Sequence, residues 1–483
     1  MFNLLHYKNA AFPCVAVETS EEERLLRNIL SIKDTEVFAI NALGGLRNCK
    51  TGDSTDGQAQ FGKAFKWISA QSGAILVVYD FQHVVRNAVA YRSLKDCFAD
   101  LKGKGSMVVL VAPSWSLPPE LVHDVPIVQF DLPDRAQLGR ALDFVAEHAE
   151  IKVSGDRVSI IDAAAGLALQ EAENAFALSL VQDKALIPGT IEREKMRLVR
   201  SSGLLEVSPV CNANQIGGLE NLKSYIKDEV IPSKDDDLLR VKGLLLVGVP
   251  GTGKSLASRV LGYMLSWPVC RMDVGSLKAG IVGQSESNMR QALKLVDAIA
   301  PAVLWLDEIE KGVGGHASSA QSDGGTTLGM IGQLLGWLQD HSSPVICVAT
   351  CNDYAKLPPE LTRAGRFDER FFVDLPTLGE REAIASIHLV KYGKNLDLLA
   401  KPIAGMTDQW SGAEIEQLVK SAARITARKI TIEALQSCQR DIKPISSVKA
   451  DEITKLREWA RGSLRIANSA EVKATQGRKV SIQ

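Results

Sequence analysis

One stretch just past the middle of the chain has the residue types and spacing of a phosphate-binding loop. In VGVPGTGKSLAS, residues 247–258, Gly248, Gly253, Lys254 and Ser255 satisfy the pattern G-x-x-x-x-G-K-[ST]. Glycines let backbone N–H groups turn toward phosphate oxygens, the lysine reaches the outer phosphates, and the serine hydroxyl can ligate Mg²⁺. The apolar run before the loop indicates a strand and the segment after it a helix. This context favours a nucleotide site over a chance match in a glycine-rich turn.

A second apolar run ends in two carboxylates. AVLWLDEIEK, residues 302–311, places Asp307 and Glu308 directly after a buried strand. Adjacent acids in that position need a partner of opposite charge, and Mg²⁺ provides one. We expect Asp307 to hold the metal, mostly through water, and Glu308 to polarise the water that attacks the γ-phosphate. The plainer alternative is a solvated acidic turn.

A third strand, PVICVATCND, ends at Asn352. An amide side chain carries a donor and an acceptor, so Asn352 can contact the γ-phosphate and position the same water. Asparagine after a strand is more often only a turn former. Its distance downstream of Asp307 favours the catalytic interpretation.

The order of these motifs resembles the AAA+ ATPases, and more narrowly the AAA branch itself. LPPELTRAGRFDERFFVDLP, residues 357–376, resembles the second region of homology of that branch. The resemblance implies that Arg363 and Arg366 are arginine fingers, which enter the nucleotide site of a neighbouring subunit. A guanidinium suits this role because it has a permanent charge and a planar fork of donors. An ion pair within the chain, with Asp368 or Glu369, is the plainer alternative.

Further segments match this family in the expected order. The segment NQIGGLENLKSYI resembles the loop that lies against adenine, and EREAIASIHLVKYG places a histidine beside the base. The segment WSGAEIEQLVKSAARI resembles the start of a lid helix, with a capping box from Ser411 to Glu414. For the histidine, simple packing is the plainer role. The nucleotide-binding residues implied are Ile216, Gly217, Pro250, Gly251, Thr252, Gly253, Lys254, Ser255, Leu256, Asp307, His388, Gly412 and Ala413, with Ser255 and Asp307 also as metal ligands.

One segment departs from the family. Members that thread polypeptides carry an aromatic residue ahead of ESE, whereas this chain has Ile281 in AGIVGQSESN. Isoleucine buries less area than Trp, Tyr or Phe, which weakens a grip on an irregular substrate. The departure counts against threading.

The first half of the chain repeats features of the second. Leu-Pro-Pro-Glu-Leu at 117–121 recurs at 357–361, and Asp-Leu-Pro at 131–133 recurs at 374–376. We interpret the first half as a degenerate copy of the same domain. An unrelated α/β domain is the alternative.

This first copy lacks the chemistry of the second. Its first strand, CVAVET, runs into three glutamates where a phosphate loop is expected, and these carboxylates would repel a triphosphate. Its acidic strand, AILVVYDF, keeps Asp80 but has Phe81 in the position expected for water activation. The finger segment is shortened to VHDVP and holds no arginine. We therefore expect that the N-terminal copy does not hydrolyse ATP.

Composition agrees with a globular protein of two or three domains. The 483 residues are 46% hydrophobic and 23% charged with a net charge of −1, so there is no electrostatic bias toward nucleic acid or membranes. The apolar runs are much shorter than the roughly 20 residues that span a bilayer, and no secretory signal is evident. Eight cysteines without a C-x-x-C pair favour reduced thiols over a metal site.

The predicted fold class is α/β: a P-loop AAA+ three-layer α/β/α domain with a helical lid, preceded by a degenerate AAA-like α/β domain with its own lid. An amphipathic helix is expected over 446–465, packed on the lid. The expected boundaries are the degenerate domain 1–133, its lid 134–200, a linker 201–215, the active large domain 216–376, a lid with the C-terminal helix 377–465, and a flexible tail 466–483.

Over nearly its whole length the chain resembles a family of AAA ATPases found in plastid and cyanobacterial genomes as a hypothetical chloroplast reading frame. GLALQEAENAFALSL, SGLLEVSPVCNANQIGGLENLKSYI and DEITKLREWARG carry this match. The resemblance implies a cytoplasmic protein of a bacterial or phage-infected cell, or a stromal protein if it is encoded in a plastid.

The expected function is that of a Mg²⁺-dependent ATPase that remodels or regulates a protein partner. Because the fingers come from a neighbour, activity requires a homo-oligomer, most simply a hexameric ring with head-to-tail contacts. Two alternatives stay open. One is a slowly hydrolysing, nucleotide-gated assembly switch or scaffold. The other is a DNA-associated loader, which the neutral charge and the lack of a basic stripe disfavour.

Overall fold

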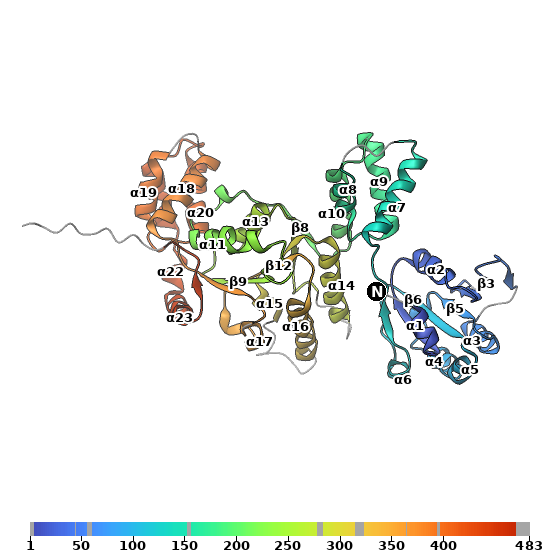
Figure 1. The fold of residues 1–483 in the computed structure, drawn as a ribbon. Helices are drawn as coiled ribbons and strands as arrows, with labels where there is room; N and C mark the ends of the chain where they lie inside the picture. Colours follow the sequence, from blue (N-terminus) through green and yellow to red (C-terminus); the bar gives the residue numbers. More distant parts are fainter. Residues whose placement is uncertain are drawn as a thin grey trace, which may run out of the picture. The chain divides into compact units, whose positions relative to one another are not determined.

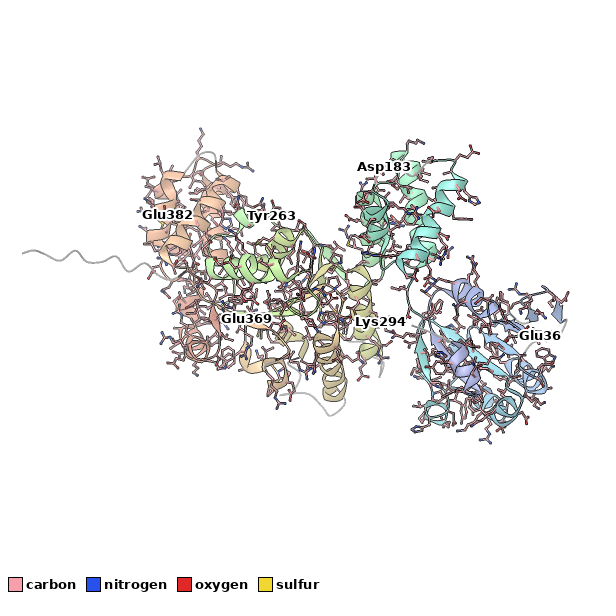
Figure 2. All side chains as sticks on the ribbon, viewed as in Figure 1. Glu36, Asp183, Tyr263, Lys294, Glu369 and Glu382 are labelled. Atoms are coloured by element: carbon pink, nitrogen blue, oxygen red, sulfur yellow. The ribbon has the colours of Figure 1, made fainter. Side chains whose placement is uncertain are left out.

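The computed structural model describes residues 4–43, 45–55, 60–151, 156–277, 284–313, 323–363, 365–393 and 397–469. Two compact units divide the chain, Met1–Lys195 and Met196–Gln483. In their described residues each unit has a seven-stranded sheet with helices around it (Figure 1). Side chains of each sheet pack into cores of that unit (Figure 2).

The sheet of the second unit has the strand order β14-β13-β9-β12-β11-β10-β8. Its strands are β8 (Glu206–Ser208), β9 (Gly243–Gly248), β10 (Val269–Met272), β11 (Ala302–Leu306), β12 (Val345–Cys351), β13 (Glu369–Val373) and β14 (Arg465–Ile466). Neighbouring strands pair in parallel, except that β8 runs antiparallel to β10. The carboxyl ends of β9, β11 and β12 therefore meet at one edge, where open α/β sheets place their ligands.

Alternate residues of these strands point to opposite faces and build two cores. Leu245 and Leu304 join one cluster with α14 and α16, whereas Leu244 and Val303 join another with α11 and α13. The helices before the lid are α11 (Glu220–Tyr225), α12 (Ile231–Ser233), α13 (Lys254–Leu265), α14 (Gln284–Ile299), α15 (Ile309–Val313), α16 (Asp323–Asp340) and α17 (Pro359–Thr362). This is the predicted three-layer α/β/α arrangement.

A helical lid follows β13. Its helices are α18 (Leu378–Tyr392), α19 (Ala400–Met406), α20 (Gly412–Ile425) and α21 (Ile432–Asp441). They enclose their own apolar core, which includes Leu389 and Leu418. Ser411 caps α20 and forms the predicted capping box with Glu414. The cap fixes where α20 begins, and this matters for the site below.

The C-terminal helix packs on the large domain instead of the lid. After α22 (Ile445–Val448), α23 (Ala450–Arg461) places Ile453, Leu456 and Ala460 in the core beside α14 and α16. Its Trp459 stacks on Tyr354, with ring centroids 3.9 Å apart. The predicted amphipathic stripe is present, but its apolar residues pack in the core of the large domain.

The first unit has the strand order β4-β3-β2-β5-β6-β1-β7. Its strands are β1 (Cys14–Glu18), β2 (Val37–Ile40), β3 (Leu46–Asn48), β4 (Ser54–Thr55), β5 (Ile75–Val78), β6 (Met107–Ala112) and β7 (Ile127–Gln129). The parallel part, β2-β5-β6-β1-β7, repeats the order β10-β11-β12-β9-β13 of the second unit. The first unit is thus AAA-like, and the predicted fold class is confirmed.

Helices of the first unit fall into two groups. Those around the sheet are α1 (Leu4–Asn9), α2 (Glu22–Leu30), α3 (Phe61–Ala70), α4 (Ala88–Lys95), α5 (Phe98–Lys104) and α6 (Pro119–Val122). Those after it are α7 (Arg135–His148), α8 (Arg157–Ala164), α9 (Leu169–Asp183) and α10 (Pro188–Ser201), which crosses into the second unit. The second group corresponds to the lid expected for this copy.

The strand ends correct the alignment of the acidic positions in the two units. Counted from the last residue of β5 and of β11, Tyr79 takes the place of Asp307 and Asp80 takes that of Glu308. Asp80 and Glu308 also share a left-handed backbone, with φ of 62° and 49°. The sequence alone instead matches Asp80 to Asp307 and Phe81 to Glu308. The match shifts by one residue because the strand in the first unit ends one residue earlier than its apolar run suggests.

Two segments expected to be a linker and a tail contribute to the fold. The predicted linker 201–215 contains β8 and the buried Leu205. The predicted tail begins within β14, and the two residues after this strand, Ala467 and Asn468, are buried. Ala467 packs in a core, and the Asn468 side chain forms hydrogen bonds through both its oxygen and its nitrogen. Residues 470–483 lie outside the described part of the chain, as does Ile281.

Asn468→Ala is expected to lower the free energy of unfolding by about 1–3 kcal/mol. The Asn468 amide donates to the buried Glu380 carboxylate at 2.8 Å and accepts from the Asp374 N–H at 2.9 Å. Alanine removes one hydrogen-bond partner from each of these two groups. Thermal unfolding monitored by circular dichroism measures the loss. An unchanged melting temperature would show that 467–469 are dispensable to the fold.

Candidate active site

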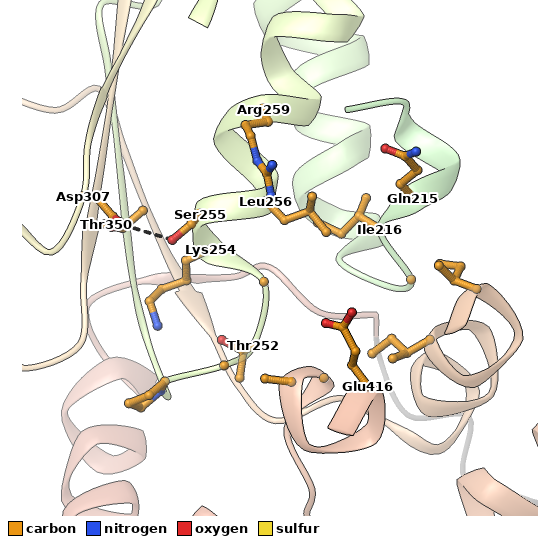
Figure 3. A pocket seen from close by; sticks show the side chains of 18 of the residues that line it. Gln215, Ile216, Thr252, Lys254, Ser255, Leu256, Arg259, Asp307, Thr350 and Glu416 are labelled. Atoms are coloured by element: carbon orange, nitrogen blue, oxygen red, sulfur yellow. Dashed lines mark hydrogen bonds between the residues drawn. The ribbon is translucent and has the colours of Figure 1, made fainter. Parts of the chain in front are cut away.

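A cavity of about 500 Å³ lies where the carboxyl ends of β9, β11 and β12 face the lid. It is lined by the phosphate loop, by the loops after β11 and β12, by the segment ahead of α11, and by α18 and α20 (Figure 3). Every nucleotide-binding residue predicted from the sequence lines it, and so do Glu308 and Asn352. The structure thus brings together segments more than 150 residues apart.

The phosphate loop has the backbone that its glycines predict. Gly251 and Gly253 have φ of 79° and 96°, in the region that favours glycine. At Gly248 a Cβ would lie 2.0 Å from the carbonyl oxygen of Val373 on β13, so only glycine fits. Gly253 directly precedes α13, so the positive end of that helix faces the cavity. This loop can cradle phosphate oxygens.

Lys254 is buried, with 6% of its surface exposed, and its ammonium is held inside the loop. Its Nζ donates to the carbonyl oxygens of Gly248 and Val249, both at 2.8 Å. Burial lowers the pKa of Lys254 to about 8, against the opposing influence of nearby acidic groups such as Glu310 and Glu308. A bound triphosphate would supply negative charge that raises the pKa of Lys254 again.

ATP binding is therefore expected to take up protons near pH 8. With a pKa of about 8 in the free pocket, about half of Lys254 is neutral at pH 8, and phosphate charge raises that pKa again. We expect uptake of up to about half a proton at pH 8 and about a tenth at pH 7. Titration calorimetry in buffers of different ionisation enthalpy measures it. A binding enthalpy independent of buffer at pH 8 would contradict the lowered pKa.

Asp307 and Ser255 form the candidate metal site. Ser255 Oγ donates to Asp307 Oδ1 at 3.0 Å, and the buried Thr350 hydroxyl donates to the same oxygen at 2.9 Å (Figure 3). Arg271 of β10 lies 3.3 Å from the other oxygen, Oδ2. A hydroxyl and a carboxylate are the hard oxygen ligands that Mg²⁺ takes beside phosphate oxygens, so the residues present fit this ion.

Glu308, the predicted base, is held by three neighbouring residues. Its Oε1 accepts from Asn352 Nδ2 at 2.9 Å, its Oε2 pairs with Lys311, and its backbone N–H donates to Thr350 Oγ1. The backbone N–H of Asn352 in turn donates to the buried Glu310 carboxylate at 3.0 Å. Glu308 and Asn352 therefore form one hydrogen-bonded pair at the cavity edge.

The lid touches the phosphate loop directly. The backbone N–H of Ala413, in the first turn of α20, donates to the carbonyl oxygen of Gly251 at 3.0 Å. Gly217 packs so closely on α18 that a Cβ would lie 2.7 Å from the backbone nitrogen of Ile384. A change at the phosphates can thus be transmitted to the lid through backbone contacts.

The two predicted finger arginines do not line this cavity. Arg363 is exposed after α17, and Arg366 donates to the carbonyl oxygen of Leu335 on α16 at 2.9 Å. Neither makes the alternative ion pair in the described residues, because Asp368 accepts from backbone N–H groups and Glu369, labelled in Figure 2, pairs with Arg465. In the part of the chain that the structure describes, neither arginine therefore contacts the nucleotide cavity of its own chain.

Comparison with known proteins agrees with this geometry. Residues 244–375 match the model of the ATPase family associated with various cellular activities (AAA). Residues 3–130 and 136–202 match the N-terminal and second domains of SpoVK-like AAA ATPases. The "Uncharacterized AAA domain-containing protein ycf46" of Guillardia theta is 30% identical over 480 residues, covering 95% of this chain and 94% of that protein. This chain belongs to the same AAA ATPase family.

As an AAA ATPase, the chain is an ATP hydrolase. The ATP-dependent zinc metalloprotease FtsH of Syntrophobacter fumaroxidans is 34% identical over 227 residues, covering 44% of this chain and 33% of that protein. The crystal structure of the FIGL-1 AAA domain in complex with ADP is 21% identical with a TM-score of 0.47, covering 56% of this chain and 97% of that one. No described helix of this AAA ATPase is long and apolar enough to cross a membrane.

Sequence reasoning missed several residues that line the cavity of this AAA ATPase. The sequence position of two of them could have indicated a place in the cavity. Thr350 lies two residues before Asn352, and Glu416 lies one helical turn after Ala413, so each shares a face with a predicted residue. The others are Gln215, Arg259, Ile384 and Ile387. Arg271, which pairs with Asp307, gave no signal because the contact joins neighbouring strands.

In the first unit of this AAA ATPase, a carboxylate occupies the position of the phosphate loop. Glu21 stands three residues after β1, as Gly251 stands three after β9. Its Oε1 accepts from the backbone N–H of Leu169 at the start of α9, at 2.6 Å, and its Oε2 pairs with Arg24 at 2.6 Å. In the first unit, the N-terminus of α9 therefore binds the Glu21 carboxylate. At the corresponding place in the second unit, the N-terminus of α20 contacts the phosphate loop. The predicted lack of a nucleotide cradle has a structural explanation.

Proposed function

We propose that this ATPase works as a ring in which arginines of a neighbouring subunit complete each Mg²⁺-dependent site. One observation supports the proposal above others. Glu308 and Asn352 are already paired at the cavity edge, whereas Arg363 is exposed and directed to no partner in its own chain among the described residues. This site has its proposed base but lacks the cation that stabilises the transition state. An arginine from a neighbouring subunit would supply that cation.

In this mechanism the chain's own residues hold ATP and activate water. The phosphate loop N–H groups and Lys254 bind the β- and γ-phosphates, and Ser255 and Asp307 would hold Mg²⁺, which supplies charge neutralisation for in-line displacement. Glu308 accepts a proton from the attacking water, while Asn352 fixes the Glu308 carboxylate and the water. Arg363 and Arg366 of the neighbour then stabilise the charge on the transferred phosphoryl group.

We propose further that hydrolysis remodels or regulates a protein partner in the cytoplasm or, for a plastid-encoded chain, in the stroma. The contacts from Ala413 to Gly251 and from Gly217 to α18 tie the lid to the nucleotide, so loss of the γ-phosphate can reorient it. An assembly switch is the second candidate. The first unit favours this candidate. Its Glu21 is bound by Leu169 and Arg24 of the same unit in the place of a nucleotide, so this domain could bind a protein partner without hydrolysing ATP.

Size and turnover measured together test the ring. Light scattering after size exclusion, with and without a non-hydrolysable ATP analogue, should show a larger assembly when the analogue is bound. Turnover per subunit should rise with protein concentration over the same range. Full turnover by a dilute preparation that stays monomeric would overturn the proposal. A ring with turnover below about one per minute, unchanged by proteins from a cell extract, would favour the switch.

A further inference from the structure

The cavity has a polar end and an apolar end. Lys254, Ser255 and Asp307 lie together at the first, and Leu256 lies beside Ile216 toward the second (Figure 3). Because α20 begins against the phosphate loop, its later residues lie progressively farther from the phosphates. Glu416 follows Ala413 by three residues, about 4.5 Å along the helix and on the same face. Glu416 is therefore a charged group at the end of the cavity where a base would bind.

The Glu416 carboxylate is fixed on one side and open on the other. Its Oε1 accepts from Tyr392 Oη at 2.6 Å and from Lys391 Nζ at 2.8 Å, and it lies 3.8 Å from His388 Nδ1. Its Oε2 has no hydrogen bond within the described part of the chain. Figure 3 shows the carboxylate directed into the space between Thr252 and Ile216.

The same contacts keep this group ionised. Burial alone would raise the pKa of Glu416, but hydrogen bonds from Lys391 and Tyr392 outweigh it and the pKa is lowered. Burial lowers the pKa of His388 beside it, which favours the neutral imidazole. The base end of the cavity thus presents one fixed, charged acceptor.

We infer that Glu416 reads the base, with Oε2 accepting a hydrogen bond from the exocyclic amino group of adenine, and that it selects ATP over GTP. This inference rests on the proposed nucleotide site. Guanine has a carbonyl oxygen at the same ring position, and a carboxylate repels it. A carboxylate can instead bind two guanine N–H groups with both oxygens, but Oε1 is already taken by Lys391 and Tyr392.

The test compares triphosphates that differ only at the base. Equilibrium binding to the full chain with Mg²⁺ would use ATP, GTP and purine riboside triphosphate, which has hydrogen in place of the amino group. We expect the unsubstituted protein to bind the purine analogue about tenfold more weakly than ATP, since the lost bond is to an ion. GTP should bind at least about a hundredfold more weakly.

Glu416→Ala should bind ATP and the purine analogue equally, because the acceptor is gone. Glu416→Gln keeps the shape and can donate its amide to a guanine oxygen, so its preference for ATP over GTP should fall at least about tenfold. Glu433→Gln, an exposed carboxylate on α21 of the same lid, is the matched control and should keep all ratios. Thermal unfolding checks that each variant is folded.

Three results would overturn the inference. One is a Glu416→Ala protein that keeps the preference for ATP over the purine analogue. The second is a Glu416→Gln protein, folded by its melting curve, with unchanged selectivity against GTP. The third is a loss of ATP affinity in Glu416→Ala that is absent when 2′-deoxy-ATP is the ligand. That result would show that the carboxylate binds the ribose hydroxyl instead of the base. If the unsubstituted protein bound none of the triphosphates, the nucleotide site itself would fail instead.

Discussion

Glu308→Gln is expected to lower ATP turnover by roughly 10²–10⁴-fold while ATP affinity stays within about threefold. Glutamine preserves the shape of the side chain, and its carbonyl oxygen can still accept from Asn352, as Glu308 Oε1 does at 2.9 Å. It cannot accept a proton from water. Binding groups such as Lys254 and Ser255 are untouched, so the loss should fall on the chemical step. Phosphate release under saturating ATP measures turnover, and calorimetry measures affinity.

Two comparisons make this result specific. Glu433→Gln on the exposed face of α21 should retain full turnover. Asn352→Ala removes one hydrogen bond to Glu308 but keeps its carboxylate, so this substitution should lower turnover less than Glu308→Gln does. If Glu308→Gln hydrolysed ATP at the unsubstituted rate, water activation would have to be assigned to another residue.

Arg363→Ala should lower turnover about a thousandfold without loss of ATP binding to the altered chain. Arg363 is exposed and lines no part of its own cavity, so the effect must act on a neighbouring site. The decisive measurement mixes Arg363→Ala with Lys254→Ala chains. The first keeps an intact phosphate loop and the second keeps an intact finger. Random mixing in a ring restores roughly a quarter of the interfaces, and turnover should return to about that level.

Each variant alone is the control for this mixture, because neither can build a complete site by itself. The ring must be shown to form by light scattering under the same conditions. A mixture that assembles but has no more activity than its components would exclude completion of the site between subunits.

Local sequence determined the phosphate loop and the lid-helix cap. The spacing from Gly248 to Ser255 and from Ser411 to Glu414 lies within one loop or one helical turn, where backbone geometry follows from residue type. The β-strands next to these motifs also follow from their apolar runs. These features are present in the structure, and every predicted nucleotide-binding residue lines the cavity. A degenerate first copy was predictable as well, because repeats are visible along the chain.

Tertiary structure decided the contacts that join distant segments. Arg271 meets Asp307 because their strands are neighbours. The apolar residues of α23 join a core built by distant helices such as α14 and α16. The register of Asp80 depends on where a strand ends, and apolar runs do not mark that point. Glu416 is one turn along a helix whose start the sequence located. Its use at the base end depends on how α20 packs against the phosphate loop, and only the folded chain fixes that packing.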